Sequence, residues 1–124
     1  DLMGNKLMSV QSSQTPALKI PKGMLQGAAN ALRHWHEHRP KMYSDLHRQG
    51  KLFEAANTAW EATVDDSMEI ESALVKQGYE APTAFVIAQQ ATRERYIYLP
   101  TEEDVPDLMR TEAGIYIYQP EQSG

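Results

Sequence analysis

One stretch, residues 51–78, constrains the fold of this chain more than any other. It reads KLFEAANTAWEATVDDSMEIESALVKQG, contains no proline, and has its only glycine at the last position. Apolar residues recur at steps of three and four from Phe53 through Trp60 to Leu74, which predicts one helix with an apolar stripe. At ~1.5 Å per residue this helix is about 40 Å long, so it needs other helices to cover its stripe.

Prolines and glycines mark the ends of two shorter helices before it. Pro21 is expected to open the first, since a proline at the first helical position loses no hydrogen bond. This helix should end at His38 or Arg39, because Pro40 disfavours helical geometry in the residue before it. Pro40 is then expected to open a second helix, with Gly50 at its end.

A last helix is predicted within residues 79–100, with Pro82 in its first turn and Pro100 as its stop. The fold class is therefore mainly α: a three- or four-helix bundle over residues 21–100. Residues 1–20 are expected to form a disordered or extended lead-in, because they are polar and lack periodicity. The predicted core consists of Met24, Leu25, Leu32, Trp35, Tyr43, Leu46, Phe53, Trp60, Val64, Leu74, Phe85 and Tyr96.

Residues 101–124 are expected to form an irregular acidic tail. The alternation IYIY at 115–118 predicts a short strand in it, whose partner is either ALKI at 17–20 or another chain. Apolar side chains spaced among the acids make the tail a candidate docking peptide for a partner protein. The candidate docking residues are Val105, Leu108, Met109, Ile115 and Ile117.

Composition limits the chemistry of this chain. It has no cysteine, which excludes disulfides, thiolate zinc sites and thiol nucleophiles and suits a cytoplasmic location. No apolar run approaches the roughly 18 residues of a membrane span. Neither a G-x-S-x-G motif nor a glycine-rich phosphate loop is present, so we expect no enzyme and no cofactor.

The sequence HWHEHRPK at 34–41 admits two interpretations. On a helix, His34 and His38 share a face with Glu37 beside them, and two imidazoles with a carboxylate can hold Zn²⁺, Ni²⁺ or Cu²⁺. The alternative is a solvated cationic helix end, where positive charge near the last carbonyl groups is favourable. A stable metal site needs a further protein ligand, and His47 is the only other histidine.

Charge is distributed unevenly along the chain. Residues 17–52 hold seven Lys/Arg against two acids, and residues 53–124 hold four against fourteen. A basic surface can bind nucleic acid if its cations share an exposed face and its aromatic residues are free to stack. The apolar stripe is instead expected to bury Trp35 and Tyr43. The candidate nucleic-acid contacts are Lys22, Arg33, Arg39, Lys41, Arg48 and Lys51.

The order of features over residues 24–98 resembles the TnpV family, small proteins encoded in bacterial transposons. The matching residues are the His38-Arg39-Pro40 helix end, Tyr43 and Leu46 in a short helix, and Gly50-Lys51-Leu52 before the long acidic helix. The methionine–tryptophan segment associated with that family before its last helix is not evident here, and residues 101–124 have no counterpart. The resemblance implies a helical fold and a setting in mobile DNA, and it carries over no catalytic residue.

The sequence is compatible with three functions. The leading one is a non-enzymatic accessory or protein-interaction protein associated with a mobile genetic element. The runner-up is a nucleic-acid-associated protein that uses the basic segment, and the third is a small metal-binding protein. The partner is expected to be another protein or a second copy, with a homodimer favoured over a monomer because the predicted core is small.

Overall fold

A computed structural model describes residues 15–120 and confirms a mainly helical fold. Its helices are α2 (Gln26–His38), α3 (Pro40–Arg48), α4 (Leu52–Lys76) and α5 (Ala81–Tyr96). Two short strands follow, β1 (Met109–Arg110) and β2 (Tyr116–Ile117). The part of the predicted lead-in before residue 15 and the end of the predicted tail after residue 120 lie outside the described residues.

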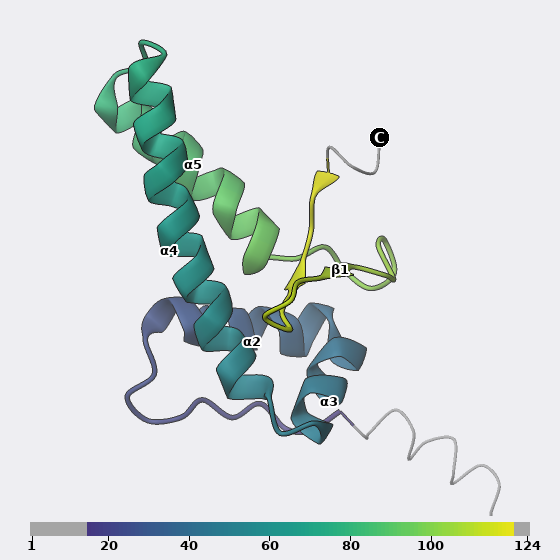
Figure 1. Cartoon of the computed structure of the whole chain (residues 1–124). Coiled ribbons are helices and arrows are strands. Elements are labelled where there is room, and N and C mark those ends of the chain that lie inside the picture. Colours follow the sequence, from purple (N-terminus) through teal and green to yellow (C-terminus); the bar gives the residue numbers. More distant parts are fainter. Residues whose placement is uncertain (1–14, 121–124) are drawn as a thin grey trace, which may run out of the picture.

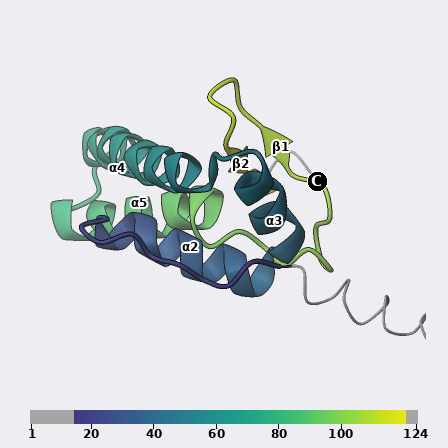
Figure 2. The same ribbon diagram turned by 90° about the horizontal axis from the view of Figure 1, so that it is seen from below.

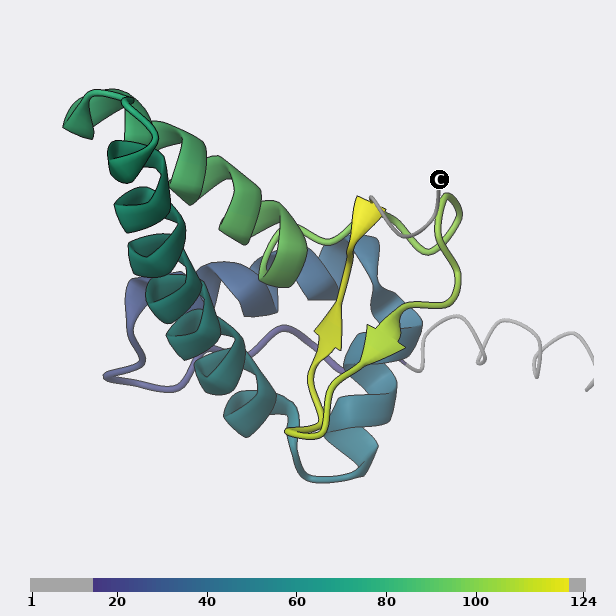
Figure 3. The same ribbon diagram turned by 45° about the horizontal axis from the view of Figure 1, so that its top comes forward.

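The long helix forms as one piece, α4, and folds back on α5 as a helical hairpin. Gly78 makes the turn with φ 109°, a left-handed conformation that favours glycine, and Pro82 lies in the first turn of α5. Figures 1 and 3 show α4 and α5 closest near this turn and diverging towards their other ends, where α2 crosses them. The hairpin tip therefore projects away from α2 and α3.

Helices α2 and α3 meet at Arg39 and Pro40, as predicted. Pro40 occupies the first turn of α3, and Gly50 follows α3 with φ 71°. Figure 2 shows α2 and α3 packed at the base of the hairpin. Gly27 in the first turn of α2 lies against the Trp60 ring of α4, and a methyl group added there would overlap that ring. The absence of a side chain thus sets how closely α2 approaches α4.

Two predicted helix boundaries are wrong. Pro21 does not open α2, which begins at Gln26. Instead, the carbonyl oxygen of Pro21 accepts a hydrogen bond from the Met24 N–H, in a turn where Gly23 has φ 84°. At the other end of the bundle, α5 stops at Tyr96 rather than at Pro100. The next residues are not helical, and two of them, Ile97 and Leu99, pack in the core with 1% exposure each.

The predicted strand at 115–118 forms over Tyr116–Ile117, but with a partner different from those considered. It pairs antiparallel with β1, in the register Met109 to Ile117 and Arg110 to Tyr116. The partner is local because Gly114, at φ 89°, helps turn the chain back on itself within a few residues. The segment ALKI is not a strand, although Ile20 packs against the core.

The core lies between α2, α3, the base of α4 and the chain that follows α5. Of the predicted core residues, Leu32, Trp35, Tyr43, Leu46 and Tyr96 are buried. Met24, Trp60 and Leu74 are partly buried. The prediction is wrong for four residues that the structure leaves exposed: Leu25, Phe53, Val64 and Phe85.

Candidate functional site

The histidine-rich stretch of α2 fastens the chain that leaves α5. The Nε2 atom of His34 lies 2.7 Å from the carbonyl oxygen of Leu99. One residue on, the Trp35 indole donates a 3.0 Å hydrogen bond to the Ile97 carbonyl oxygen. These bonds join residues more than sixty positions apart, so this face of α2 is committed to the fold.

Arg39 lies at the centre of this attachment and is only 2% exposed. Its guanidinium donates to the carbonyl oxygens of Pro100 at 2.9 Å, Val105 at 2.6 Å and Pro106 at 3.3 Å. Burial lowers the pKa of Arg39, and the nearby Glu102 carboxylate partly offsets that effect. The prediction that Arg39 contacts nucleic acid is therefore wrong, because the side chain is buried and both of its terminal nitrogens donate to the protein's own backbone.

Glu102 connects the predicted acidic tail to the start of α3. Its carboxylate accepts hydrogen bonds from the N–H groups of Lys41 at 3.1 Å and Met42 at 2.9 Å. These N–H groups belong to the first turn of α3, which has no cap from its own flanking residue. A negative charge at this end of a helix is also favoured by the helix dipole.

The two histidines of the candidate metal site, His34 and His38, lie side by side, but His34 already has a backbone partner. The rings of His34 and His38 have centroids 4.4 Å apart. Burial lowers the pKa of His34, and its Nε2 atom faces the Leu99 carbonyl oxygen. His36 lies apart from this pair, with its own Nε2 atom 3.0 Å from the Pro16 carbonyl oxygen. Within residues 15–120, no group of three or more histidine, aspartate or glutamate side chains is arranged to hold a metal ion.

The remaining candidate nucleic-acid contacts are exposed: Lys22, Arg33, Lys41, Arg48 and Lys51. Two of them have partners on the same helix. Arg33 donates to the Asn30 side chain at 3.0 Å, and Arg48 forms an ion pair with Asp45. Trp35 and Tyr43 are 1% exposed, so neither ring is available for stacking on a base.

The candidate docking residues of the tail divide between core and surface. The prediction is wrong for Ile115 and Ile117, which are 3% and 7% exposed and belong to the core. Val105 and Leu108 are partly buried, and Met109 is 51% exposed on β1. The segment fails as a free docking peptide because its alternating isoleucines pack inward on the helices.

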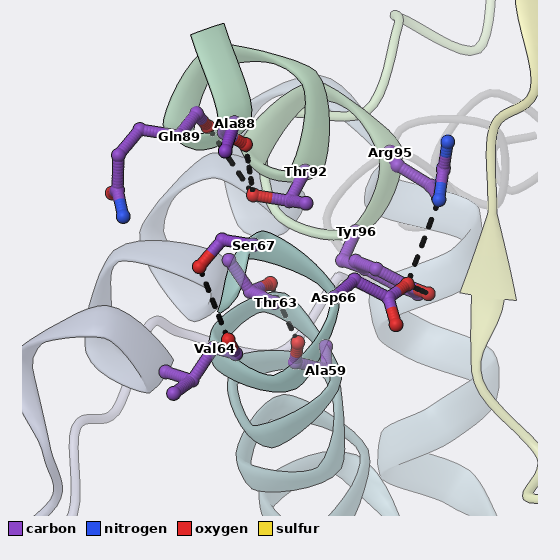
Figure 4. A network of polar contacts seen from close by, with 10 residues as sticks. All are labelled: Ala59, Thr63, Val64, Asp66, Ser67, Ala88, Gln89, Thr92, Arg95 and Tyr96. Atoms are coloured by element: carbon purple, nitrogen blue, oxygen red, sulfur yellow. Dashed lines mark hydrogen bonds and ion pairs between the residues drawn. The ribbon is translucent and has the colours of Figure 1, made fainter. Parts of the chain in front are cut away.

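Helices α4 and α5 pack against each other through side chains that were not predicted to be in the core. Their contact consists of small residues four apart: Ala59, Thr63 and Ser67 on α4, and Ala84, Ala88 and Thr92 on α5. The Thr63 and Thr92 hydroxyls donate to carbonyl oxygens of their own helices, at 2.7 Å and 2.8 Å, so burial leaves neither donor unpaired (Figure 4). The four-residue repeat of small side chains was the signal that would have identified this contact.

Close packing through small residues turns larger apolar side chains to the surface. In Figure 4, Val64 and Gln89 lie on one side of the helix pair, and the Asp66–Arg95 ion pair lies on the other. Met68 and Val75 follow Val64 at helical spacing, and Phe85 and Val86 precede Gln89 by one turn. We call this group the arm face. It consists of Val64, Met68, Val75, Phe85 and Val86, which are 38–64% exposed.

A row of acids runs beside the arm face. Trp60, Val64 and Met68 are each followed directly by an exposed acid, so Glu61, Asp65 and Glu69 form a parallel row one residue further round α4. Residues 61–90 contain six acids and one lysine, Lys76. The depression of about 400 Å³ on α4 between Met68, Val75 and Lys76 lies within this surface.

The opposite side of the helix pair carries a polar cluster. The Tyr96 hydroxyl donates to the Asp66 carboxylate, and Arg95 lies 3.5 Å from the same carboxylate (Figure 4). Burial raises the pKa of Tyr96, and its hydrogen bond to Asp66 adds to that effect. This cluster joins α4 to α5 and has the composition of a structural contact.

No helix in the described part of the chain is both long and apolar enough to cross a membrane. Comparison of this chain with protein-family models, with curated proteins and with solved structures found no match in any of the three.

Proposed function

We propose that this protein is a non-enzymatic protein-interaction module and that the arm face is its binding surface. The observation that carries the proposal is the exposure of five apolar side chains on one side of a projecting helix pair, while the core buries its own apolar residues. Contiguous exposed apolar surface at the end of a projecting element is typical of a binding site. Among residues 15–120, the groups with shifted pKa values are His34, Arg39, Tyr43 and Tyr96, and all four serve the fold, which supports a non-enzymatic role.

The partner that fits this surface is a basic amphipathic helix of another protein. Apolar side chains of such a helix would cover Val64, Met68 and Phe85, and lysines or arginines beside them would face Glu61, Asp65 and Glu69. The excess of acids over bases in residues 61–90 attracts a basic partner during encounter.

A second copy of this chain fits the arm face less well, although a homodimer was expected. Two arm faces in contact would bring two acid rows together, which repel each other. The basic residues of a second copy lie around α2 and α3, whose apolar sides are already buried in their own core. The resemblance to the TnpV family supports a partner within the machinery of a mobile genetic element, in the bacterial cytoplasm.

The test uses designed peptides and the full chain. One amphipathic helical peptide carries leucines on one face with lysines beside them, and its match has glutamates in place of the lysines. Calorimetry should detect binding of the lysine peptide, weakened by added salt, and none of the glutamate peptide. Met68→Lys combined with Phe85→Lys should weaken binding about tenfold or more, whereas Met109→Lys, a control with a comparably exposed methionine on β1, should not.

Three results would contradict the proposal. Equal binding of both peptides would exclude recognition of charge, and an equal effect of Met109→Lys would place the binding surface elsewhere. A concentration-dependent dimer that Met68→Lys abolishes in sedimentation would make a second copy the occupant of the arm face.

A further inference from the structure

A cavity of about 320 Å³ lies between the first turn of α2 and the helix pair. Its walls come from three separate helices and from the chain that follows α5. This volume is at the lower end of the range of small-molecule sites. The lining residues are Gln26, Gly27, Asn30, Trp60, Arg93, Ile97 and Tyr98.

Arg93 is the single charged residue among these lining residues. Its guanidinium carbon lies 5.8 Å from the centre of the Trp60 ring, and its Nε atom is buried without a hydrogen-bond partner among the described residues. No carboxylate of residues 15–120 forms an ion pair with it, although Arg95, two positions on, pairs with Asp66. A guanidinium group in a cavity wall that no described carboxylate neutralises favours an anionic acceptor from outside.

Other donors surround the same space. The carbonyl oxygen of the Asn30 side chain accepts from Arg33, which leaves the amide nitrogen without a described partner. Helix α2 begins beside the cavity with no side-chain cap and no acid in its first turn, so the N–H groups of Gln26 and Gly27 add to the positive potential. Trp60 and Ile97 supply apolar surface next to these donors.

We propose that this cavity binds the oxyanion group of a small ligand, a phosphate or a carboxylate, whose apolar part packs on Trp60. The guanidinium of Arg93 supplies the charge, and the Asn30 amide supplies a second donor. A second cavity, of about 330 Å³, is lined by Arg39 and Lys41 but also by Asp45, Glu102 and Asp107, so its carboxylates oppose an anion. This inference does not depend on the function of the arm face.

The probes are phenyl phosphate, benzoate and the neutral benzamide, titrated into ¹⁵N-labelled full-length protein. Binding should shift the NMR signals of the Gly27 amide and the Trp60 indole for at least one anion. A preference for phenyl phosphate or for benzoate identifies the oxyanion. Benzamide should bind about tenfold more weakly or not at all.

Matched variants distinguish a loss of anion binding from a loss of folding. Arg93→Gln should weaken anion binding about tenfold, while Arg95→Gln, which changes the arginine of α5 that pairs with Asp66, should leave it unchanged. If Arg93→Gln does not fold, Asn30→Ala gives the same test by removing the second donor. The proposal is overturned if neither anion shifts these signals at millimolar concentration. It is equally overturned if benzamide binds as well as the anions do, or if Arg93→Gln binds like the wild type.

Discussion

Arg39 and Val105 lie 66 positions apart in the chain, and the Arg39 guanidinium donates a 2.6 Å hydrogen bond to the Val105 carbonyl oxygen. With the bonds to Pro100 and Pro106, this contact fixes the segment after α5 to the junction of α2 and α3. A planar fork of donors suits three carbonyl groups that approach from different directions. The arginine of HWHEHRPK therefore has a structural role.

Arg39→Met should destabilise the protein by about 2–4 kcal/mol, because three carbonyl groups lose their donors in a buried site. Urea unfolding measures the change. Arg33→Met, on the exposed side of α2, should stay within about 0.5 kcal/mol of the wild type. Equal losses in both variants would show that the carbonyl contacts do not matter.

Glu102→Gln should cost about 1 kcal/mol, since the first turn of α3 loses a charged acceptor for the N–H groups of Lys41 and Met42. Glu103→Gln is the matched control, because Glu103 is exposed and bonds to neither group. Thermal unfolding at neutral pH compares the two variants. A Glu103→Gln loss as large as that of Glu102→Gln would contradict the capping role.

His34 predicts a loss of stability in mild acid. Burial holds its pKa in the folded state below 6.5, its value in the unfolded chain, so the unfolded chain binds more protons in that interval. The free energy of unfolding should therefore fall as the pH drops below about 6.5, until the pH passes the folded-state pKa. Glu37 raises the pKa of His34 and His38 lowers it, and each effect is smaller than that of burial.

Melting temperatures measured between about pH 7.5 and pH 5.5 test this expectation. His34→Gln should flatten the dependence, because glutamine keeps an N–H donor but does not titrate in this range. His47→Gln, which changes an exposed histidine on α3, should leave it as in the wild type. An unchanged slope in His34→Gln would assign the acid sensitivity to another group.

Ala88→Leu should destabilise the helix pair by about 1–3 kcal/mol, since Ala88 is 1% exposed in a contact made of small side chains. Ala91→Leu places the same side chain on the exposed side of α5 and should change the free energy of unfolding by no more than about 0.5 kcal/mol. Chemical unfolding of both variants measures these changes in the free energy of unfolding. Tolerance of leucine at position 88 would mean that α4 and α5 are not closely packed.

Periodicity identified α4 and α5 but placed some of their exposed residues, Val64 and Phe85 among them, in the core. Val64 and Phe85 were expected in the core because large apolar side chains usually are buried. The structure buries Ala59 and Ala88 instead and leaves Val64 and Phe85 exposed. A hydrophobic pattern shows only that one side of a helix is apolar. Whether the stripe of small side chains or the stripe of large ones is buried depends on the neighbouring helix.

The candidate sites were still less predictable. His34 and Arg39 were recognised as unusual, but their partners are backbone carbonyl groups near residues 99–106, and no side-chain pattern reveals a carbonyl acceptor. The arm face and the Arg93 cavity were not predicted, since each combines residues from separate helices.

The sequence by itself determined where the helices of the described chain are interrupted, because Pro40, Gly50, Gly78 and Pro82 act through the geometry of their own backbone. Only the tertiary structure decided which stripe of each helix is buried, where β2 finds its partner, and that Arg39 holds the chain together. Those outcomes depend on contacts between distant segments, and their free energies arise only once the segments have come together.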